Sequence, residues 1–344
     1  MPFRADIDGN PSFANCERKD AMSMENQNLE KDLGFYSLFF KGMPMAKVLS
    51  DLLKDRTTGK NIVWATSNYE SYGAHYRMNR QILPETCLNL VMAGILVPRI
   101  EKTKEQQDQR TREKAEVFTP SWIVNKMNNF CDEQWFMRKD VFNTENEEEH
   151  TWTPVEGEIG FPRGRDQYKR AKWQQYVDSR RCEITCGEAP YMVSRYDATT
   201  GEFLPLQKRV GFLDRKLRVI NENAATHKEW LDWTYRAYQA SYGFEFQGDS
   251  LFLARVNLVQ TFIEYYRAKW QKEPTMAMIQ QIVDIVTWNV WQMDGLKDVT
   301  PCGTPMDDFL PTDDAEKEAE EVFCRIKDWR SGKTPTYHSL KGGK

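Results

Sequence analysis

The chain has 344 residues, of which 40% are hydrophobic and 28% are charged. These proportions are typical of globular proteins, and no run approaches the roughly 20 apolar residues of a membrane-spanning helix, so a wholly disordered chain and a membrane-spanning chain are both excluded. The formal net charge of −4 at pH 7 provides no global positive field, so binding to a polyanion would need local basic patches.

Cysteine usage and the first residues indicate the compartment. The seven cysteines are an odd number dispersed along the chain, which favours reduced thiols over a disulfide framework. Residues 1–10 lack the basic and then apolar pattern of a signal peptide. We therefore expect a cytoplasmic protein. No C-x-x-C or H-x-x-x-H spacing occurs, so the sequence predicts no metal site.

The first third of the chain is interpreted as an arm followed by a helical region. Residues 1–35 are polar without periodicity and predict a loose N-terminal arm. Residues 36–60 are apolar at helical spacing and predict a core helix. Residues 61–100 combine an extended piece with a second apolar stretch, and the charged run 101–116 indicates an exposed helix or linker. Residues 36–115 are thus expected to be mostly helical.

A new segment begins near residue 116. Pro120 followed by Ser121 favours the start of a helix that continues to Phe136. The acidic residues 144–150 predict a solvated loop. Residues 163–181 hold seven basic and two acidic residues with three interleaved aromatic residues. This stretch has two interpretations, a phosphate-contacting surface and a solvated helix with an aromatic side.

From about residue 182 onward, short apolar strands alternate with long helices, a pattern typical of α/β proteins. Strands are expected at 182–186, at 242–246 and within 288–294. Helices are expected at 229–240, at 249–270 and from Pro274 onward. No element is assigned to residues 197–228, which read as an insertion.

Three sequences carry candidate chemistry, in chain order: Phe118-Thr119-Pro120, Glu183 to Tyr191, and Gly243 to Phe246. In an open α/β sheet, a nucleotide-like ligand lies outside the carboxyl ends of the strands. Gly187 and Ala189 permit close approach of the backbone there, and Glu245 could accept hydrogen bonds from two ribose hydroxyls. A dinucleotide-binding dehydrogenase is disfavoured, because G-x-G-x-x-G does not occur and the acidic residue is not about 20 residues further on.

Four sequences resemble the motifs of adenine-specific DNA methyltransferases from restriction–modification systems. AEVFTPSWIVNKM resembles their cofactor-binding helix, and CEITCGEAPYMVSRYD their glycine-rich first motif. GFEFQGDSLFLARVNL resembles the following acidic motif, and WNVWQMDGL the next one, whose Asp faces the adenine of the cofactor. The resemblance covers about residues 60–330 and is strongest to chains often labelled restriction endonuclease subunit M.

This resemblance implies a Rossmann-like, S-adenosylmethionine-dependent methyltransferase fold over residues 116–330, preceded by the helical N-terminal region and followed by a flexible tail at 331–344. It also implies that double-stranded DNA is the substrate and S-adenosylmethionine the cofactor. The implied cofactor-binding residues are Phe118, Thr119, Pro120, Glu183, Thr185, Cys186, Gly187, Glu245 and Asp294.

The sequence departs from the family pattern in three places. Glu183 stands where Asp is usual, and Ala189 replaces the second glycine. The catalytic Asn/Asp-Pro-Pro-Tyr/Phe is missing, since the chain contains no Pro-Pro pair. That motif accepts hydrogen bonds from the exocyclic amine of adenine and stacks a ring on the flipped base. The sequence from Glu188 to Tyr191 is only superficially similar, so the catalytic residues stay unassigned.

Because the chain ends about where that motif would begin, the resemblance implies a split enzyme. This chain would bind the cofactor and be inactive alone, and a second protein subunit would supply catalysis and target recognition. Two alternatives stay open, a non-catalytic DNA-binding or scaffold subunit and a restriction nuclease subunit, although no P-D…(D/E)-x-K carboxylate cluster is evident. Structural roles are open too: Glu245 as a strand-end carboxylate, Asp294 as a turn cap, and Cys182 with Cys186 as packing residues.

Overall fold

The computed structural model describes residues 45–98, 119–162, 172–303 and 321–342. Residues Ala46–Lys344 form one compact unit, and Met1–Met45 fall outside it. The domain limits expected at residues 35 and 115 stay predictions. In the described part of the chain, no helix combines the length and the apolar character needed to cross a membrane.

A three-stranded parallel sheet lies at the centre of the unit. Its strands are β3 (Arg181–Ile184), β4 (Ser241–Glu245) and β5 (Val290–Gln292), in the order β3-β4-β5. The register places Glu183 opposite Gly243 and Phe244 opposite Trp291. These strands alternate with helices along the chain, which confirms the predicted α/β class.

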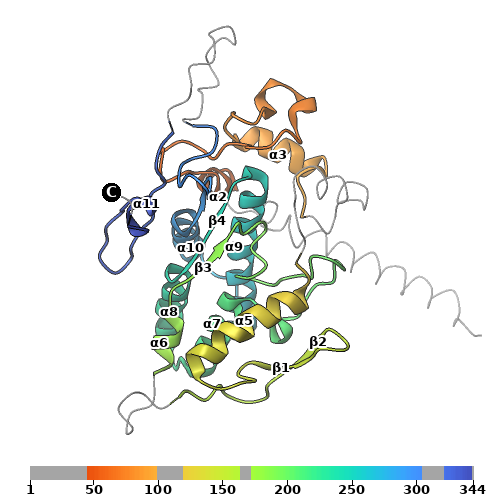
Figure 1. Ribbon diagram of the computed structural model, residues 1–344, viewed down its shortest axis with the longest axis vertical. Helices are drawn as coiled ribbons and strands as arrows, with labels where there is room; N and C mark the ends of the chain where they lie inside the picture. Colours follow the sequence, from red (N-terminus) through yellow and green to blue (C-terminus); the bar gives the residue numbers. More distant parts are fainter. Residues whose placement is uncertain (1–44, 99–118, 163–171, 304–320, 343–344) are drawn as a thin grey trace, which may run out of the picture. The chain divides into compact units, whose positions relative to one another are not determined.

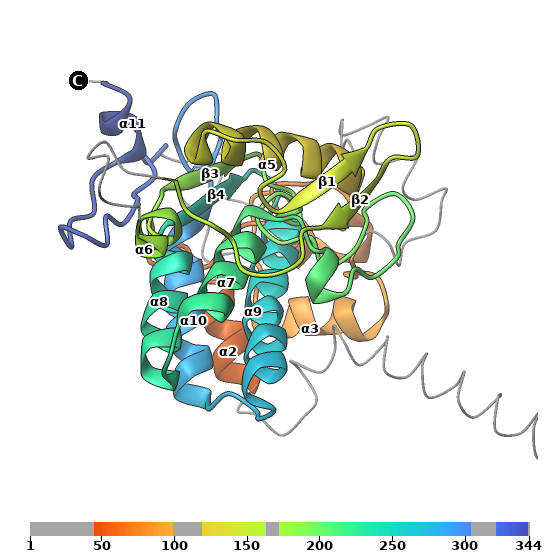
Figure 2. The ribbon, with the colours of Figure 1, turned by 90° about the horizontal axis from the view of Figure 1, so that it is seen from below.

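Four helices connect the three strands and run side by side along the sheet (Figures 1 and 2). They are α7 (Phe212–Asn223), α8 (His227–Gln239), α9 (Gly248–Trp270) and α10 (Met276–Asn289). The side chains of Thr226 and Thr275 cap α8 and α10 by accepting hydrogen bonds from backbone N–H groups of the first turn. Both connections advance in the same direction, so right-handed crossovers place all four helices on one face of the sheet.

The two faces of the sheet differ in chemistry because successive side chains point to opposite sides of a strand. The helix-covered face carries Glu183, Gly243, Glu245 and Gln292. The other face carries Cys182, Ile184, Tyr242, Phe244 and Trp291. We call these the polar face and the aromatic face.

The C-terminal residues 321–342 cover part of the aromatic face. Cys324 joins a buried cluster with Tyr242, Phe244 and Trp291, and Tyr337 at the start of α11 (Tyr337–Leu340) packs against it. The Tyr337 ring lies 5.6 Å from the Trp291 ring and 5.9 Å from the Phe244 ring, measured between centroids. The edge of this face is open, since Ile184 is 67% exposed.

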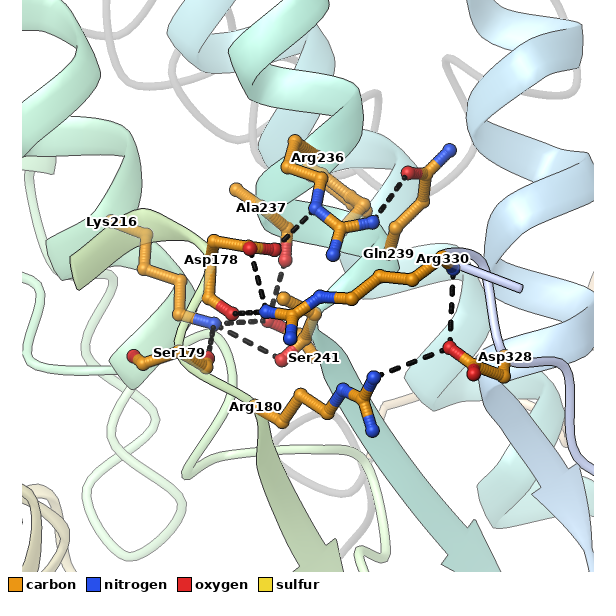
Figure 3. A network of polar contacts seen from close by, with 12 residues as sticks. Asp178, Ser179, Arg180, Lys216, Arg236, Ala237, Gln239, Ser241, Asp328 and Arg330 are labelled. Atoms are coloured by element: carbon orange, nitrogen blue, oxygen red, sulfur yellow. Dashed lines mark hydrogen bonds and ion pairs between the residues drawn. The ribbon is translucent and has the colours of Figure 1, made fainter. Parts of the chain in front are cut away.

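A buried lysine joins the amino ends of β3 and β4 (Figure 3). The Lys216 ammonium is 0% exposed and donates hydrogen bonds to Ser179 O (2.7 Å), Ala240 O (3.1 Å) and Ser241 Oγ (3.3 Å). Burial, reinforced by the positive charge of Arg181, holds the pKa of Lys216 well below its usual range. The lysine thus adds hydrogen bonds to backbone carbonyl groups at this end of the sheet, one of which, Ala240 O, also accepts from Arg181 N at 3.1 Å.

A second buried charge cluster attaches the segment before the sheet. Helix α5 (Ser121–Phe136) carries Asp132, which forms ion pairs with Arg181 of β3 and Arg215 of α7. The hydroxyl of Tyr176, in α6 (Trp173–Val177), donates to the same carboxylate at 2.9 Å. The sequence left residues 163–181 open as a phosphate-contacting surface. Arg181 does not serve such a surface, because its guanidinium is committed to this cluster. Residues 163–171 lie outside the described part.

The acidic residues 144–150 lie in a β-hairpin and not in one continuous loop. Strands β1 (Asn143–Asn146) and β2 (Thr151–Pro154) pair antiparallel. Asn143 in β1 exchanges side-chain hydrogen bonds of 2.8 and 3.0 Å with Asn125 of α5. The prediction of a solvated loop was wrong for residues 144–146, which form part of β1, whereas residues 147–150 form an exposed turn. The pattern considered only solvation, which both strands and loops can have on an outer edge.

The described N-terminal residues contain two α-helices, α2 (Met45–Leu52) and α3 (Pro84–Met92), and two short 3₁₀ helices, η1 (Glu70–Tyr72) and η2 (Ala74–Tyr76). A further 3₁₀ helix, η4 (Leu206–Lys208), precedes α7. Gln292 of β5 holds this N-terminal part, since its side chain accepts from Val63 N (2.9 Å) and donates to Val63 O (2.8 Å). The predicted exposed element at 101–116 lies wholly in residues outside the described part.

The Asp132 cluster yields a stability prediction. The substitution Asp132→Asn removes the negative charge between two buried guanidinium groups, which should lower the free energy of unfolding by about 3–5 kcal/mol in urea titrations. Glu147→Gln breaks an exposed ion pair with Lys126, which lies on α5 like Asp132. This control should leave the urea midpoint unchanged. Equal midpoints for both variants would show that the cluster contributes nothing.

Candidate functional site

The loop after β3 is organised by the buried carboxyl group of Glu183. Its oxygens accept hydrogen bonds from Tyr191 N (3.1 Å) and Met192 N (2.9 Å). Burial raises the pKa of Glu183 to about 8, the two backbone hydrogen bonds oppose this increase, and the nearby Glu245 adds to it. Glu183 therefore closes the loop onto its own strand.

A second buried carboxyl group, that of Glu245, lies at the carboxyl end of the neighbouring strand β4. It accepts hydrogen bonds from Gly187 N at 2.8 Å and from Gln247 N at 3.1 Å. Burial raises its pKa, again against the effect of the backbone hydrogen bonds. Glu245 thus connects the β3 loop with the start of α9, so the structure brings Glu183, Gly187 and Glu245 together.

The β3 loop has an unusual backbone. Thr185, Gly187 and Ala189 have φ angles of 48°, 52° and 66°. This left-handed region is costly for a β-branched residue such as Thr185, and such strain concentrates at functional sites. At Gly187 a Cβ atom would meet nothing within 4 Å, so the backbone angle rather than the space favours glycine there.

The start of α5 reaches the same loop through Tyr191. Thr119 lies close to the hydroxyl of Tyr191, whose pKa burial raises and Thr119 lowers, and Asn128 of α5 donates to Tyr191 O at 3.1 Å. Pro120 occupies the N-cap position of α5. Two of the three residues of the predicted helix-opening motif therefore lie beside the strand loop, and Phe118 lies outside the described residues.

An aspartate beyond the loop fixes the first turn of α5. Asp197 accepts a hydrogen bond of 2.7 Å from Ser121 N. Burial raises its pKa, but hydrogen bonds from Thr199, Ser121 and Thr200 outweigh burial and lower the pKa to about 2. Sequence reasoning missed Asp197 and Asn128, and it named Tyr191 without predicting its contact with α5, because nothing in the spacing of these residues indicates that they meet.

Two further predicted residues have structural positions. Cys186 is buried, and its Cβ would lie 3.4 Å from a Cβ built on Gly243 of β4, so Cys186 packs against the sheet. Asp294 follows β5, and its Oδ1 accepts from Leu296 N (2.9 Å) and Lys297 N (3.3 Å). Asp294 therefore caps its own turn, which is the structural role that the sequence left open for it.

Three pockets in the described part of the molecule can be compared with the predicted site. A cavity of about 10 Å³ lies beside Arg209 and Arg215, and one of about 180 Å³ lies between α5 and the β1–β2 hairpin. A third, of about 380 Å³, lies over the aromatic face. None of these three is lined by the predicted cofactor residues. A ligand of Glu245 would therefore have to exchange with the N–H groups it already binds.

The described residues also bear on metal and thiol chemistry. Among the described residues, no group of three or more His, Cys, Asp and Glu side chains could hold a metal ion. The six cysteines in the described part are free thiols. Comparisons of the chain with protein-family models, with curated proteins and with solved structures gave no match. The geometry and the sequence motifs are therefore the basis for a functional proposal.

The raised pKa of Glu183 predicts a pH dependence of stability. Folding favours the protonated carboxyl, so its contribution is complete below about pH 4.5, the ordinary value, and is lost as the pH rises through about 8. Between these values the free energy of unfolding should fall by up to about 1.4 kcal/mol per pH unit through this group.

The substitution Glu183→Gln should remove that fall, whereas Glu85→Gln, at an exposed position in α3, should keep it. Urea titrations from pH 5 to pH 8 measure the difference. Parallel pH profiles for the parent and Glu183→Gln would contradict the assignment.

Proposed function

We propose that this chain is the S-adenosylmethionine-binding component of an adenine-specific DNA methyltransferase in a restriction–modification system. The observation that carries the proposal is the meeting of Glu183, Gly187 and Glu245 at the carboxyl ends of adjacent parallel strands. Thr119, from the helix-opening motif, lies beside them through Tyr191. Ligands of open α/β sheets bind at this position.

The order β3-β4-β5, with helical crossovers on one face, also suits one half of a doubly wound sheet. We therefore extend the proposal to a Rossmann-like methyltransferase fold. The residues present fit the cofactor, because Glu245 offers two carboxylate oxygens for the hydroxyls of a ribose. Gly187 leaves open space where a side chain would stand, since a Cβ atom built there meets nothing within 4 Å.

In this proposal S-adenosylmethionine supplies an electrophilic methyl group. Glu245 would accept the ribose hydroxyls in exchange for Gly187 N, and the freed N–H would turn toward the ligand. Glu183 would keep the rest of the loop closed, since its hydrogen bonds go to Tyr191 and Met192. Asp294 would contact the adenine of the cofactor only after losing its hydrogen bonds from Leu296 N and Lys297 N.

Catalysis is assigned to a second polypeptide, because residues 1–344 contain no Pro-Pro pair. The sequence Glu188 to Tyr191 has structural duties that argue against a catalytic role. The Glu188 carboxylate pairs with the hydroxyl of Tyr196, and Tyr191 is held in the loop through its N–H and its carbonyl. The Glu188 carboxylate is therefore already engaged, and the backbone of Tyr191 has a structural role in the loop.

A second candidate function has one observation in its favour. Both oxygens of Glu245 already bind backbone N–H groups, which is also how a structural carboxylate would behave. This arrangement suits a non-catalytic DNA-binding or scaffold subunit that retains the fold without the cofactor. The two candidates differ in whether the purified chain binds S-adenosylmethionine.

Glu245→Ala tests the cofactor assignment by isothermal titration with S-adenosylmethionine. Losing a charge-assisted hydrogen bond costs roughly 1.5–3 kcal/mol, so the variant should bind at least about tenfold more weakly than the parent. Glu245→Gln should fall between the two. Glu273→Ala, an exposed carboxylate paired with Arg267, is the control and should bind normally. A parent chain that folds without binding the cofactor would favour the scaffold.

A tritium-transfer assay tests the assignment of catalysis. The amine of adenine is a poor nucleophile unless an acceptor and a stacking ring position it, so bound cofactor alone lacks an aligned nucleophile. The isolated chain should transfer negligible tritium from labelled S-adenosylmethionine to mixed-sequence DNA. Transfer should begin when a partner carrying Asn-Pro-Pro-Tyr is added. Strong transfer by the chain alone would overturn the split arrangement.

A further inference from the structure

The aromatic face of the sheet holds a pocket of about 380 Å³ that is separate from the carboxyl-end site. All three strands contribute to one wall, through Cys182, Tyr242 and Trp291. The C-terminal residues form the opposite wall, with Ile326, Pro335, Tyr337 and Leu340 among them. Pockets for small organic ligands have this size and this mainly apolar lining.

The C-terminal wall is held in place by contacts around the pocket. The Tyr242 hydroxyl donates to Lys327 O at 3.2 Å, and Tyr337 N donates to Cys324 O at 2.7 Å. Trp329 Nε1 donates to Asn289 Oδ1 at 2.7 Å. A ligand would therefore enter a preformed cavity and would spend little binding energy on ordering the protein.

Two ion pairs fasten the same wall at the amino end of the sheet (Figure 3). Arg330 pairs with Asp178 at 2.6 Å, and Arg180 pairs with Asp328 at 3.2 Å. Asp178 also binds Arg236 of α8, so the C-terminal segment is tied to the helix layer as well as to β3. Arg180 and Asp328 themselves line the pocket.

The charged residues of the lining are mostly positive. The lining contains one carboxylate, that of Asp328, and four cationic side chains, those of Arg180, Arg181, Lys327 and Lys333. Arg181 is committed to Asp132, and the Lys327 ammonium lies 4.0 Å from the centroid of the Trp329 ring. Lys333 forms no ion pair with any described residue. Lys333 is therefore the cation that can meet an anion here, and the half-exposed Arg180, whose pair with Asp328 is 3.2 Å long, lies beside it.

We propose that this pocket binds a small organic anion with a flat apolar ring, the ring lying among Tyr242, Trp291 and Tyr337 and the anionic group beside Lys333 and Arg180. The aromatic walls recognise the ring by stacking and burial, and the cations recognise the charge. Partial desolvation, together with Glu183, raises the pKa of the Cys182 thiol to about 12. Cys182 is therefore a neutral wall residue at physiological pH, so binding is non-covalent.

A pair of fluorescent probes tests both parts of the proposal. 8-Anilinonaphthalene-1-sulfonate carries a flat ring and an anionic group, and N-phenyl-1-naphthylamine lacks the charge. Titrated into the full chain, the sulfonate should bind at one saturable site. Lys333→Gln should raise the Kd of the sulfonate about three- to fivefold, the range of a partly exposed charge contact, and should leave the Kd of the neutral probe unchanged. Lys228→Gln, an exposed lysine of α8, is the charge control.

Cys182→Trp should fill the pocket and abolish binding of both probes, whereas Cys182→Ala should preserve it. Thermal melts establish that each variant is folded, and if Cys182→Trp fails to fold, the two probes with Lys333→Gln decide the question. Sulfonate binding that Cys182→Trp leaves intact, or that S-adenosylmethionine displaces, would place the probe elsewhere and overturn the proposal. If Lys333→Gln raised the Kd of both probes equally, the proposal that Lys333 recognises the anionic group would be overturned.

Discussion

The structure depends on two carboxylates buried at the carboxyl ends of adjacent parallel strands. Glu183 and Glu245 form no ion pair with any described residue, and a buried carboxyl group is costly unless hydrogen bonds compensate for lost water. The donors within reach are backbone N–H groups, and three of the four belong to the loop that follows β3. That loop must therefore fold back over the strand ends, which accounts for the left-handed backbone at Thr185 and for the position of Tyr191.

The opposite end of the sheet is organised by charges of the other sign. Lys216 binds carbonyl groups at the amino ends of β3 and β4, and Asp132 compensates two buried arginines. The surrounding ion pairs of Asp178 tie helix α8 and the C-terminal segment together. Each polar cluster joins segments that are distant in the chain, so the clusters determine which segments pack together as well as how stable the fold is.

The alternation of strand side chains separates two places where a ligand could bind. The polar face ends in the Glu183–Glu245 arrangement, where the proposed cofactor would exchange with backbone N–H groups. The aromatic face ends in a pocket with a positive rim, which is already open. Because the two lie on opposite faces of the same strands, different side chains line them.

The sequence by itself determined most of the elements around the sheet. Apolar periodicity predicted α9, and α10 from Pro274 onward, within a few residues, and the short apolar runs predicted β3, β4 and β5. It did not predict α7, which lies in residues 197–228, or the strand β1. Only the tertiary structure decided which residues meet. The sequence could not show that Arg181 turns inward to Asp132, 49 residues away, or that Tyr191 joins Thr119. Periodicity indicates which face of an element is apolar. The partner of a buried polar group depends on how distant segments fold together, so the spacing of residues in the sequence does not predict that partner.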